Sequence, residues 1–200
     1  MTTNTIEPIH PHDAYIHKLH FEFDWDALKP ICEQLVNSEN AKSALITDGR
    51  SSHFNKIQPH RIEQFKTFYT WLSPLVKDIF TEKSAYSKEM MEYYINNSWV
   101  NVHHTGGKTN AHNHTNTFMV ATAYLHLPEN GGFFECKDPL EYNKGFYYSD
   151  NNDWLWKEIP TISGDVLIFP SWLKHKTQIN QSLEDRWVLT TNFTQEFKKI

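Results

Sequence analysis

The periodicity of the sequence changes from helical to alternating near residue 91, and this change limits the folds open to the chain. Apolar and polar residues alternate in four later segments, as they do in strands. Turn residues separate these segments, with no helical pattern between them. The segments are MEYYINNSWVNVHH (91–104), TFMVATAYLHL (117–127), DVLIFPSWL (165–173) and RWVLTTNFTQEF (186–197), with turns at Gly106-Gly107, Pro128 to Gly132 and Gly164. This order predicts an antiparallel sandwich or barrel.

Two helices are predicted before the strands. The first is expected to start near Asp24 or Asp26, with Leu28, Ile31 and Leu35 at helical spacing and Pro30 limiting how early it begins. The second covers 60–80, where apolar residues recur at spacings of three and four. Ser73-Pro74 is expected to kink this helix or to split it in two.

These patterns predict one domain over residues 1–200, mainly β with N-terminal helices (an α+β chain). Residues 1–14 are polar and rich in proline, and are expected to form a flexible tail. Residues 15–90 are a largely helical support, although YIHKLHFEF at 15–23 alternates like a strand and 38–57 shows no pattern. Residues 91–200 form the β core.

Composition excludes several classes of protein. The net charge of −5 argues against binding duplex nucleic acid, which needs a basic surface. The chain has neither a signal-peptide pattern nor a run of 18 apolar residues, so no membrane contact is expected. Cys32 and Cys136 lack metal-site spacing and are expected to be buried thiols in a reducing compartment. The expected location is the cytoplasm. The sequence leaves a homodimer open.

The chain has twelve histidines, and two of them suggest a metal site. His112 and His114 are separated by one residue, so in a strand both side chains project from the same face and can reach one ion. This pair alone is a weak signal, and His175 after the strand 165–173 offers a third ligand. His126 is expected to have a structural role. Six others are expected to be solvated: His10, His12, His17, His20, His53 and His60.

Arg186 lies at the start of an apolar strand, eleven residues after His175. A buried guanidinium is costly without an anionic partner, and its geometry matches a carboxylate. A carboxylate ligand beside the metal is therefore one interpretation. The alternative is an arginine at the strand edge that reaches water.

Residues 98–193 resemble the Fe(II)- and 2-oxoglutarate-dependent oxygenases, particularly small bacterial and phage proteins of the prolyl-hydroxylase-like branch. The motifs that carry the resemblance are SWVNVHHTGGKTNAHNH, AYLHLPENGG, GDVLIFPSWLKHKTQIN and RWVLTTNF, in this order. The resemblance implies a double-stranded β-helix (jelly roll) backed by N-terminal helices. It also implies an iron enzyme that hydroxylates a substrate with dioxygen and converts 2-oxoglutarate to succinate and CO2.

Transferred residue by residue, the resemblance makes His112, His114 and His175 the iron ligands and Arg186 the partner of the distal carboxylate of 2-oxoglutarate. Tyr124 would donate its phenol to that carboxylate, unless it is simply a core residue. Further residues are candidates for contact with the cosubstrate or for the pocket lining: His103, Asn101, Trp99, Thr177 and Thr190. The two threonines also suit the core or solvent.

The chain departs from the family pattern at two positions. His114 stands where relatives usually carry Asp or Glu, so three neutral imidazoles leave the metal charge uncompensated by protein. Zn(II) or Cu(II) would then compete better with iron. A histidine here also argues against halogenation, because halogenating relatives leave this position open for halide. Val188 stands where relatives often have Ser or Thr, and Thr190 is a candidate replacement.

Residues 133–157 form an aromatic-rich insertion that is expected to act as a lid or substrate platform. Its candidate contact residues are Phe146, Tyr147, Tyr148, Trp154 and Trp156. Two alternative functions stay open: a non-catalytic cupin-like module that binds a metal or small ligand, and a cupin-type dioxygenase that needs no 2-oxoglutarate. A small-molecule or peptidyl substrate is expected, and the sequence does not identify it.

Overall fold

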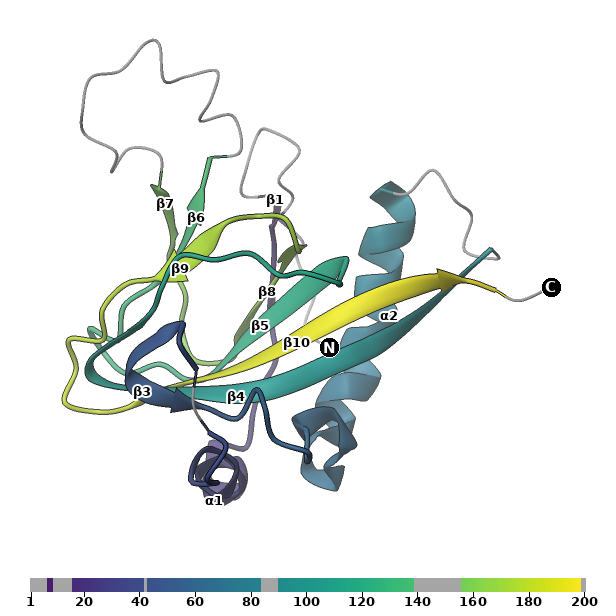
Figure 1. Ribbon diagram of the computed structural model, residues 1–200. Coiled ribbons are helices and arrows are strands. Elements are labelled where there is room, and N and C mark those ends of the chain that lie inside the picture. Colours follow the sequence, from purple (N-terminus) through teal and green to yellow (C-terminus); the bar gives the residue numbers. More distant parts are fainter. Residues whose placement is uncertain (1–6, 9–15, 42, 84–89, 139–155, 199–200) are drawn as a thin grey trace, which may run out of the picture.

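The computed structural model describes residues 7–8, 16–41, 43–83, 90–138 and 156–198. The strands in these residues form two antiparallel sheets (Figure 1). The seven-stranded sheet contains, in spatial order, β1 (Glu7–Pro8), β2 (His17–His20), β8 (Asp165–Pro170), β5 (Met119–His126), β10 (Arg186–Phe197), β4 (Met91–Thr109) and β3 (Ile46–Ser51). The three-stranded sheet contains β7 (Trp156–Ile159), β6 (Phe134–Lys137) and β9 (His175–Thr177). The predicted antiparallel sandwich is confirmed.

The first helix, α1 (Trp25–Val36), begins directly after its N-cap residue, Asp24. The Asp24 carboxylate accepts a hydrogen bond from the Ala27 N–H at 3.2 Å, which satisfies one of the free donors at the helix start. The expectation that Pro30 delays the helix is wrong. Pro30 and Asp26 are both exposed, so water can solvate the Asp26 carbonyl that lacks a helical donor.

The second helix, α2 (Lys66–Lys83), starts later than the predicted 60–80. Two short 3₁₀ turns, η1 (Pro59–Arg61) and η2 (Glu63–Phe65), precede it. Of the two outcomes expected at Ser73-Pro74, a kink or a split, the split does not occur, because α2 passes through Pro74 as one element.

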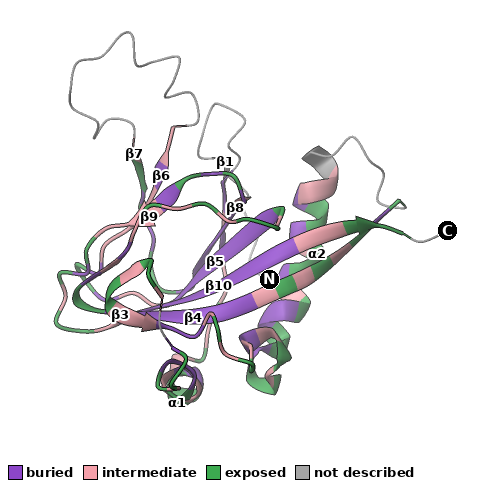
Figure 2. Ribbon diagram, in the orientation of Figure 1, coloured by how far each residue is buried: buried purple, intermediate pink, exposed green. Residues whose placement is uncertain are grey.

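Two hydrophobic cores lie on opposite faces of the large sheet, and strand alternation assigns residues to each. On β8, Val166 and Ile168 pack with the helices in one core, while Leu167 and Phe169 belong to the core between the sheets. The central strands are therefore buried on both faces (Figure 2). One face of this sheet supports the helices, and the other forms a floor on which a site can be built.

The region before residue 91 contributes more to the sheet than its sequence suggests. The strand expected at 15–23 is present as β2, which pairs with β8. The stretch 38–57, which shows no pattern, contains β3, which pairs with β4. β4 also runs to Thr109, past the expected turn at Gly106-Gly107. A Cβ at Gly107 would lie 2.3 Å from the Asp48 carbonyl oxygen, so glycine there permits the close approach of β3.

Several histidines expected to be solvated have structural contacts. His17 is buried in β2. His20 faces Asp165 at 3.2 Å, and His60 bonds to the Ser98 hydroxyl at 2.8 Å. His126 stacks on Trp25, in agreement with its predicted structural role. His10 and His12 lie outside the described residues.

Several predictions fall on segments that lie partly or wholly outside the described residues. The tail 1–14 and the lid candidates Phe146, Tyr147, Tyr148 and Trp154 fall largely or wholly outside the described residues. Trp156 lies at the start of β7, under the Lys176 ammonium at 4.4 Å. Cys32 and Cys136 are buried free thiols, as predicted. Within the described chain, neither helix combines the length and apolar character needed to span a membrane.

Candidate functional site

Backbone pairing fixes the relative positions of three histidines at the edge of the small sheet. His112 and His175 exchange two backbone N–H to carbonyl hydrogen bonds, each 2.9 Å long. The His114 N–H donates to the Ser171 carbonyl, also at 2.9 Å. The segment after β4 is thereby attached to β9, and residues 61 and 63 positions apart in sequence present their side chains together.

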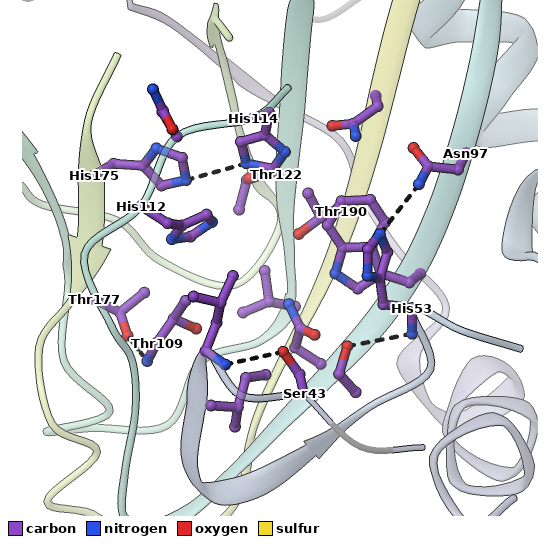
Figure 3. A pocket seen from close by; sticks show the side chains of 18 of the residues that line it. Ser43, His53, Asn97, Thr109, His112, His114, Thr122, His175, Thr177 and Thr190 are labelled. Atoms are coloured by element: carbon purple, nitrogen blue, oxygen red, sulfur yellow. Dashed lines mark hydrogen bonds between the residues drawn. The ribbon is translucent and has the colours of Figure 1, made fainter. Parts of the chain in front are cut away.

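The three imidazoles converge on one point, as Figure 3 shows. His112, His114 and His175 each offer a ring nitrogen, and these atoms lie within 4.8 Å of one another. The Nε2 atoms of His114 and His175 are 3.3 Å apart. Two or three nitrogen atoms at this spacing are suited to a shared metal ion about 2 Å from each.

The hydrogen bonds of the rings leave Nε2 available for a metal. Nδ1 of His112 donates to the Asn110 carbonyl and Nδ1 of His175 to the Leu173 carbonyl, both at 2.8 Å. A proton on Nδ1 leaves a lone pair on Nε2, and such backbone bonds commonly orient metal-binding histidines. The donor set therefore fits a divalent metal.

Burial keeps these imidazoles neutral. Desolvation lowers the pKa of His112, lowers the pKa of His114 to about 3, and lowers the pKa of His175 well below its ordinary value. The neighbouring rings lower the last two further. Neutral imidazole is the form that binds metals, so the site needs no proton release near neutral pH.

The triad borders a cavity of about 410 Å³ between the sheets. Its floor is one face of the large sheet, where Trp99 opposes Thr190 and Asn101 opposes Val188 in the register of β4 and β10. None of its described lining residues is Lys, Arg, Asp or Glu. The lining includes Ser51, His53, Asn97, Trp99, Asn101, His103, Thr109, Thr122, Phe134, Thr177, Val188, Thr190 and Asn192.

Arg186 is 0% exposed and lies behind one end of this cavity. Its Nη1 donates to the carbonyls of Gly131 at 2.5 Å and Gln178 at 3.0 Å. The Gly132 carbonyl is 3.2 Å away, and a Cβ on Gly132 would lie 3.0 Å from Nη1. Burial lowers the pKa of Arg186 to about 10, so the group stays charged at neutral pH. The alternative of an arginine that reaches water is wrong.

Two further side chains contact the guanidinium, and a third contacts one of these two. Nη2 of Arg186 donates to the Thr177 hydroxyl at 2.8 Å, and Nε faces His103 Nδ1 at 3.4 Å. His103 is 1% exposed, and burial with the nearby Arg186 charge lowers its pKa well below the ordinary value. Its Nε2 lies 2.7 Å from the Thr109 hydroxyl.

The remaining sequence candidates divide between the cavity and the core. Asn101 and Trp99 line the cavity beside His103, as strand alternation predicts. Thr177 and Thr190 also line it. Tyr124 is fully buried in the core between the sheets, near Arg186, and does not appear in the cavity wall. Burial raises the pKa of Tyr124 to about 12.

Sequence reasoning missed Thr109 and the aromatic contacts of His53. Thr109 is six residues after His103, an even spacing that puts both on one face, but the glycines between them suggested a turn. His53 is half-buried, and its ring centroid lies 4.4 Å from that of Trp99. Burial lowers its pKa. Asn97 donates to the His53 ring at 3.2 Å, and these two residues lie across the cavity from Thr177 (Figure 3).

Comparison with known proteins gives one family match and several similar folds. Residues 97–192 match the family described as "Putative 2OG-Fe(II) oxygenase". A search of curated proteins gives no match.

Three solved structures share the fold at low sequence identity. A prolyl-4-hydroxylase from Pseudomonas putida is 13% identical, with 91% of this chain and 93% of that chain covered and a TM-score of 0.60. HygX from Streptomyces hygroscopicus, solved with nickel, 2-oxoglutarate and hygromycin B, is 12% identical (90% and 83% covered, TM-score 0.61). The viral collagen prolyl hydroxylase of Paramecium Bursaria Chlorella virus-1, in complex with 2-oxoglutarate, is 13% identical (90% and 96% covered, TM-score 0.59). The predicted jelly-roll fold is confirmed.

Proposed function

We propose that this chain is a hydroxylase of the superfamily of Fe(II)- and 2-oxoglutarate-dependent oxygenases, and the family match over residues 97–192 supports this proposal. His112, His114 and His175 would hold the iron, and 2-oxoglutarate would lie between the triad and Arg186. The observation that carries the proposal is the convergence of three neutral imidazoles beside a cavity backed by a buried cation.

When bound, Fe(II) and 2-oxoglutarate supply the oxidative chemistry: one oxygen atom of O2 enters a substrate C–H bond and the cosubstrate becomes succinate and CO2. The protein contributes position and exclusion of water. The backbone carbonyls of Asn110 and Leu173 orient two of the imidazoles. Phe134 and Phe169 pack against the His175 ring, with centroids 5.2 and 4.8 Å away, and shield it from solvent.

The cavity wall away from Arg186 supports an uncharged substrate group next to the iron. Trp99 and His53 offer flat aromatic faces, and Asn97 and Asn101 offer neutral carboxamides. A charged group here would lose its water without meeting an opposite charge in the described lining. A neutral part of a small molecule or peptide would avoid this cost.

One observation favours a second candidate, a cupin-like module that binds a metal or small ligand without catalysis. The guanidinium of Arg186 already has carbonyl, hydroxyl and imidazole partners within the protein. Its N–H groups therefore have hydrogen-bond partners within the protein and do not need a bound carboxylate.

Anaerobic titration separates the two candidates. Fe(II) is added to the metal-free protein, followed by 2-oxoglutarate, and the visible absorption is recorded. We expect a weak charge-transfer band that saturates at one 2-oxoglutarate per chain. His114→Ala should lose the band because it removes a ligand, whereas His104→Ala, at an exposed histidine paired with Asp185, should keep it. Iron binding without any response to 2-oxoglutarate would contradict the oxygenase and support the module.

A further inference from the structure

We propose that the cavity wall away from Arg186 binds a neutral saccharide unit, so that the substrate of the hydroxylase is a carbohydrate or a glycoside. This inference rests on the proposed function, because it places the saccharide beside the metal triad. The proposed function requires only an uncharged group at this wall. The hydrogen-bonding groups of the wall go further and select a group that carries several hydroxyls.

The cavity is lined by groups that both donate and accept hydrogen bonds. More than half of its described lining residues are asparagine, threonine or serine, and the asparagines are Asn96, Asn97, Asn101, Asn113, Asn116 and Asn192. A carboxamide has two N–H donors and a carbonyl acceptor, and a hydroxyl has one donor and two lone pairs. A saccharide hydroxyl has the same double capacity and can pair with any of these groups. A peptide N–H only donates, and a peptide carbonyl only accepts.

The described lining offers no opposite charge to a charged sugar. It contains no Lys, Arg, Asp or Glu. His53 is the histidine of this wall, and burial lowers its pKa, so its ring is neutral near neutral pH. The ammonium of an amino sugar, or a sugar phosphate, would lose its water here without meeting a countercharge. The lining therefore favours neutral saccharides.

An aromatic residue flanked by two asparagines lies on the cavity face of β4. Asn97, Trp99 and Asn101 alternate along the strand and all line the cavity, with Trp99 about 6–7 Å along the strand from each asparagine. The ring centroids of Trp99 and His114 are 5.9 Å apart, so a ligand over this stretch lies next to the metal triad. The C–H face of a sugar ring is apolar and suits an aromatic side chain. Hydroxyls at the ring edge would then face the two asparagines.

Both of these asparagines lack a partner that a hydroxyl would supply. The carboxamide oxygens of Asn97 and Asn101 are buried and have no hydrogen-bond partner among the described residues. Asn97 donates its NH2 group to the His53 ring at 3.2 Å, so its oxygen is the acceptor that remains. Asn101 is only 8% exposed, which leaves little water to pair with it. A ligand hydroxyl that donates to either oxygen would relieve the cost of its burial.

The size of the cavity suits one ring better than an extended chain. Its volume of about 410 Å³ lies toward the lower end of ligand sites, which range from about 300 to 1,000 Å³. The same cavity must also hold 2-oxoglutarate. An extended peptide advances about 3.3 Å per residue and would need several residues to pass through. A single saccharide unit is compact and can enter with the rest of a glycoside left outside.

Saturation-transfer NMR tests the proposal on protein loaded with Zn(II), which is diamagnetic, in the presence of 2-oxoglutarate. The probes are the methyl glycosides of glucose, galactose, mannose, N-acetylglucosamine and ribose, together with uncharged peptides of alanine, serine and proline. We expect saturation transfer to at least one neutral glycoside. Its amino-sugar analogue, in which an ammonium replaces one hydroxyl, should bind about 10-fold more weakly or worse. Transfer to the peptides alone, or to none of the glycosides, would overturn the proposal.

Variants of the two asparagines locate the binding site. Asn101→Leu removes one donating and accepting group and should weaken the glycoside that responds about 3- to 10-fold, the value of one neutral hydrogen bond. Asn97→Leu should give a similar loss. Asn40→Leu, at an exposed asparagine outside the cavity lining, should leave the affinity unchanged. Chemical denaturation shows whether each variant is folded. Unchanged affinity in both folded cavity variants would overturn the proposal.

The Fe(II) titration described above separates this proposal from the proposed function. A wild-type protein that gives the 2-oxoglutarate band but binds no glycoside would overturn the saccharide site alone. A protein that binds a glycoside but gives no band would overturn the proposed oxygenase and leave the saccharide site in place.

Discussion

The two ends of the cavity differ in how their polar groups are paired. At the arginine end (Arg186, His103, Thr109 and Thr177), donors and acceptors form one connected set of hydrogen bonds. At the asparagine end (Asn97 and Asn101, with His53 and Trp99), the carboxamide oxygens of both asparagines are buried and have no hydrogen-bond partner among the described residues.

The difference suggests what each end binds. Moving one group in a connected set of hydrogen bonds disturbs the bonds of the others. The arginine end therefore suits a ligand that is always the same, such as a cosubstrate. Buried oxygens without partners carry a desolvation cost that a ligand with N–H or O–H groups would relieve. We therefore expect the asparagine end to receive its missing partners from the substrate.

The largest expected effect comes from dismantling the arginine end. Arg186→Met keeps most of the volume but leaves up to three buried carbonyls without their donor, at about 1–3 kcal/mol each. We expect the free energy of unfolding, measured by chemical denaturation, to fall by about 3–5 kcal/mol. Arg50→Met, which removes one bond to the Ser38 carbonyl, should cost less than about 1 kcal/mol and serves as the control. Similar costs for the two variants would remove the distinction between the ends.

The smallest expected effect lies at the asparagine end. Asn101→Leu replaces a carboxamide whose oxygen is unpaired with an apolar group of similar shape, so the free energy of unfolding should change by less than about 1 kcal/mol. Asn180→Leu is the matched control. Asn180 donates to the His103 and Glu184 carbonyls and accepts from the Ser182 N–H, so its loss should cost more than about 2 kcal/mol. A larger cost for Asn101→Leu than for Asn180→Leu would reverse the comparison.

The sequence was sufficient for the elements whose pattern is local. Alternation at 91–104 and 186–197 predicted β4 and β10, and the spacing of His112 and His114 with a later His175 predicted the cluster that the backbone bridge now explains. The resemblance to the oxygenases added the jelly-roll fold and the expectation that Arg186, already singled out by its place in an apolar strand, binds 2-oxoglutarate. Each of these signals depends on side-chain order alone.

The rest depends on backbone groups that sequence patterns do not show. The partners of Arg186 are mainly carbonyls of Gly131, Gly132 and Gln178, and any residue type has a carbonyl. The expected carboxylate partner was inferred from side-chain chemistry alone, and none appears among the described contacts of Arg186. Thr109 was missed because glycines usually mark turns. Here Gly107 lies inside β4, and its lack of a side chain permits the close approach of the neighbouring strand β3.

The central claim is that three imidazoles, without a protein carboxylate, hold the iron that binds 2-oxoglutarate. X-ray absorption at the iron edge of the anaerobic Fe(II)-loaded protein, recorded before and after addition of 2-oxoglutarate, tests it most directly. We expect three imidazoles per iron in both spectra, two in His114→Ala, and additional oxygen ligands when the cosubstrate is present. Fewer than three imidazoles in the wild-type protein, or a spectrum that 2-oxoglutarate leaves unchanged, would contradict it.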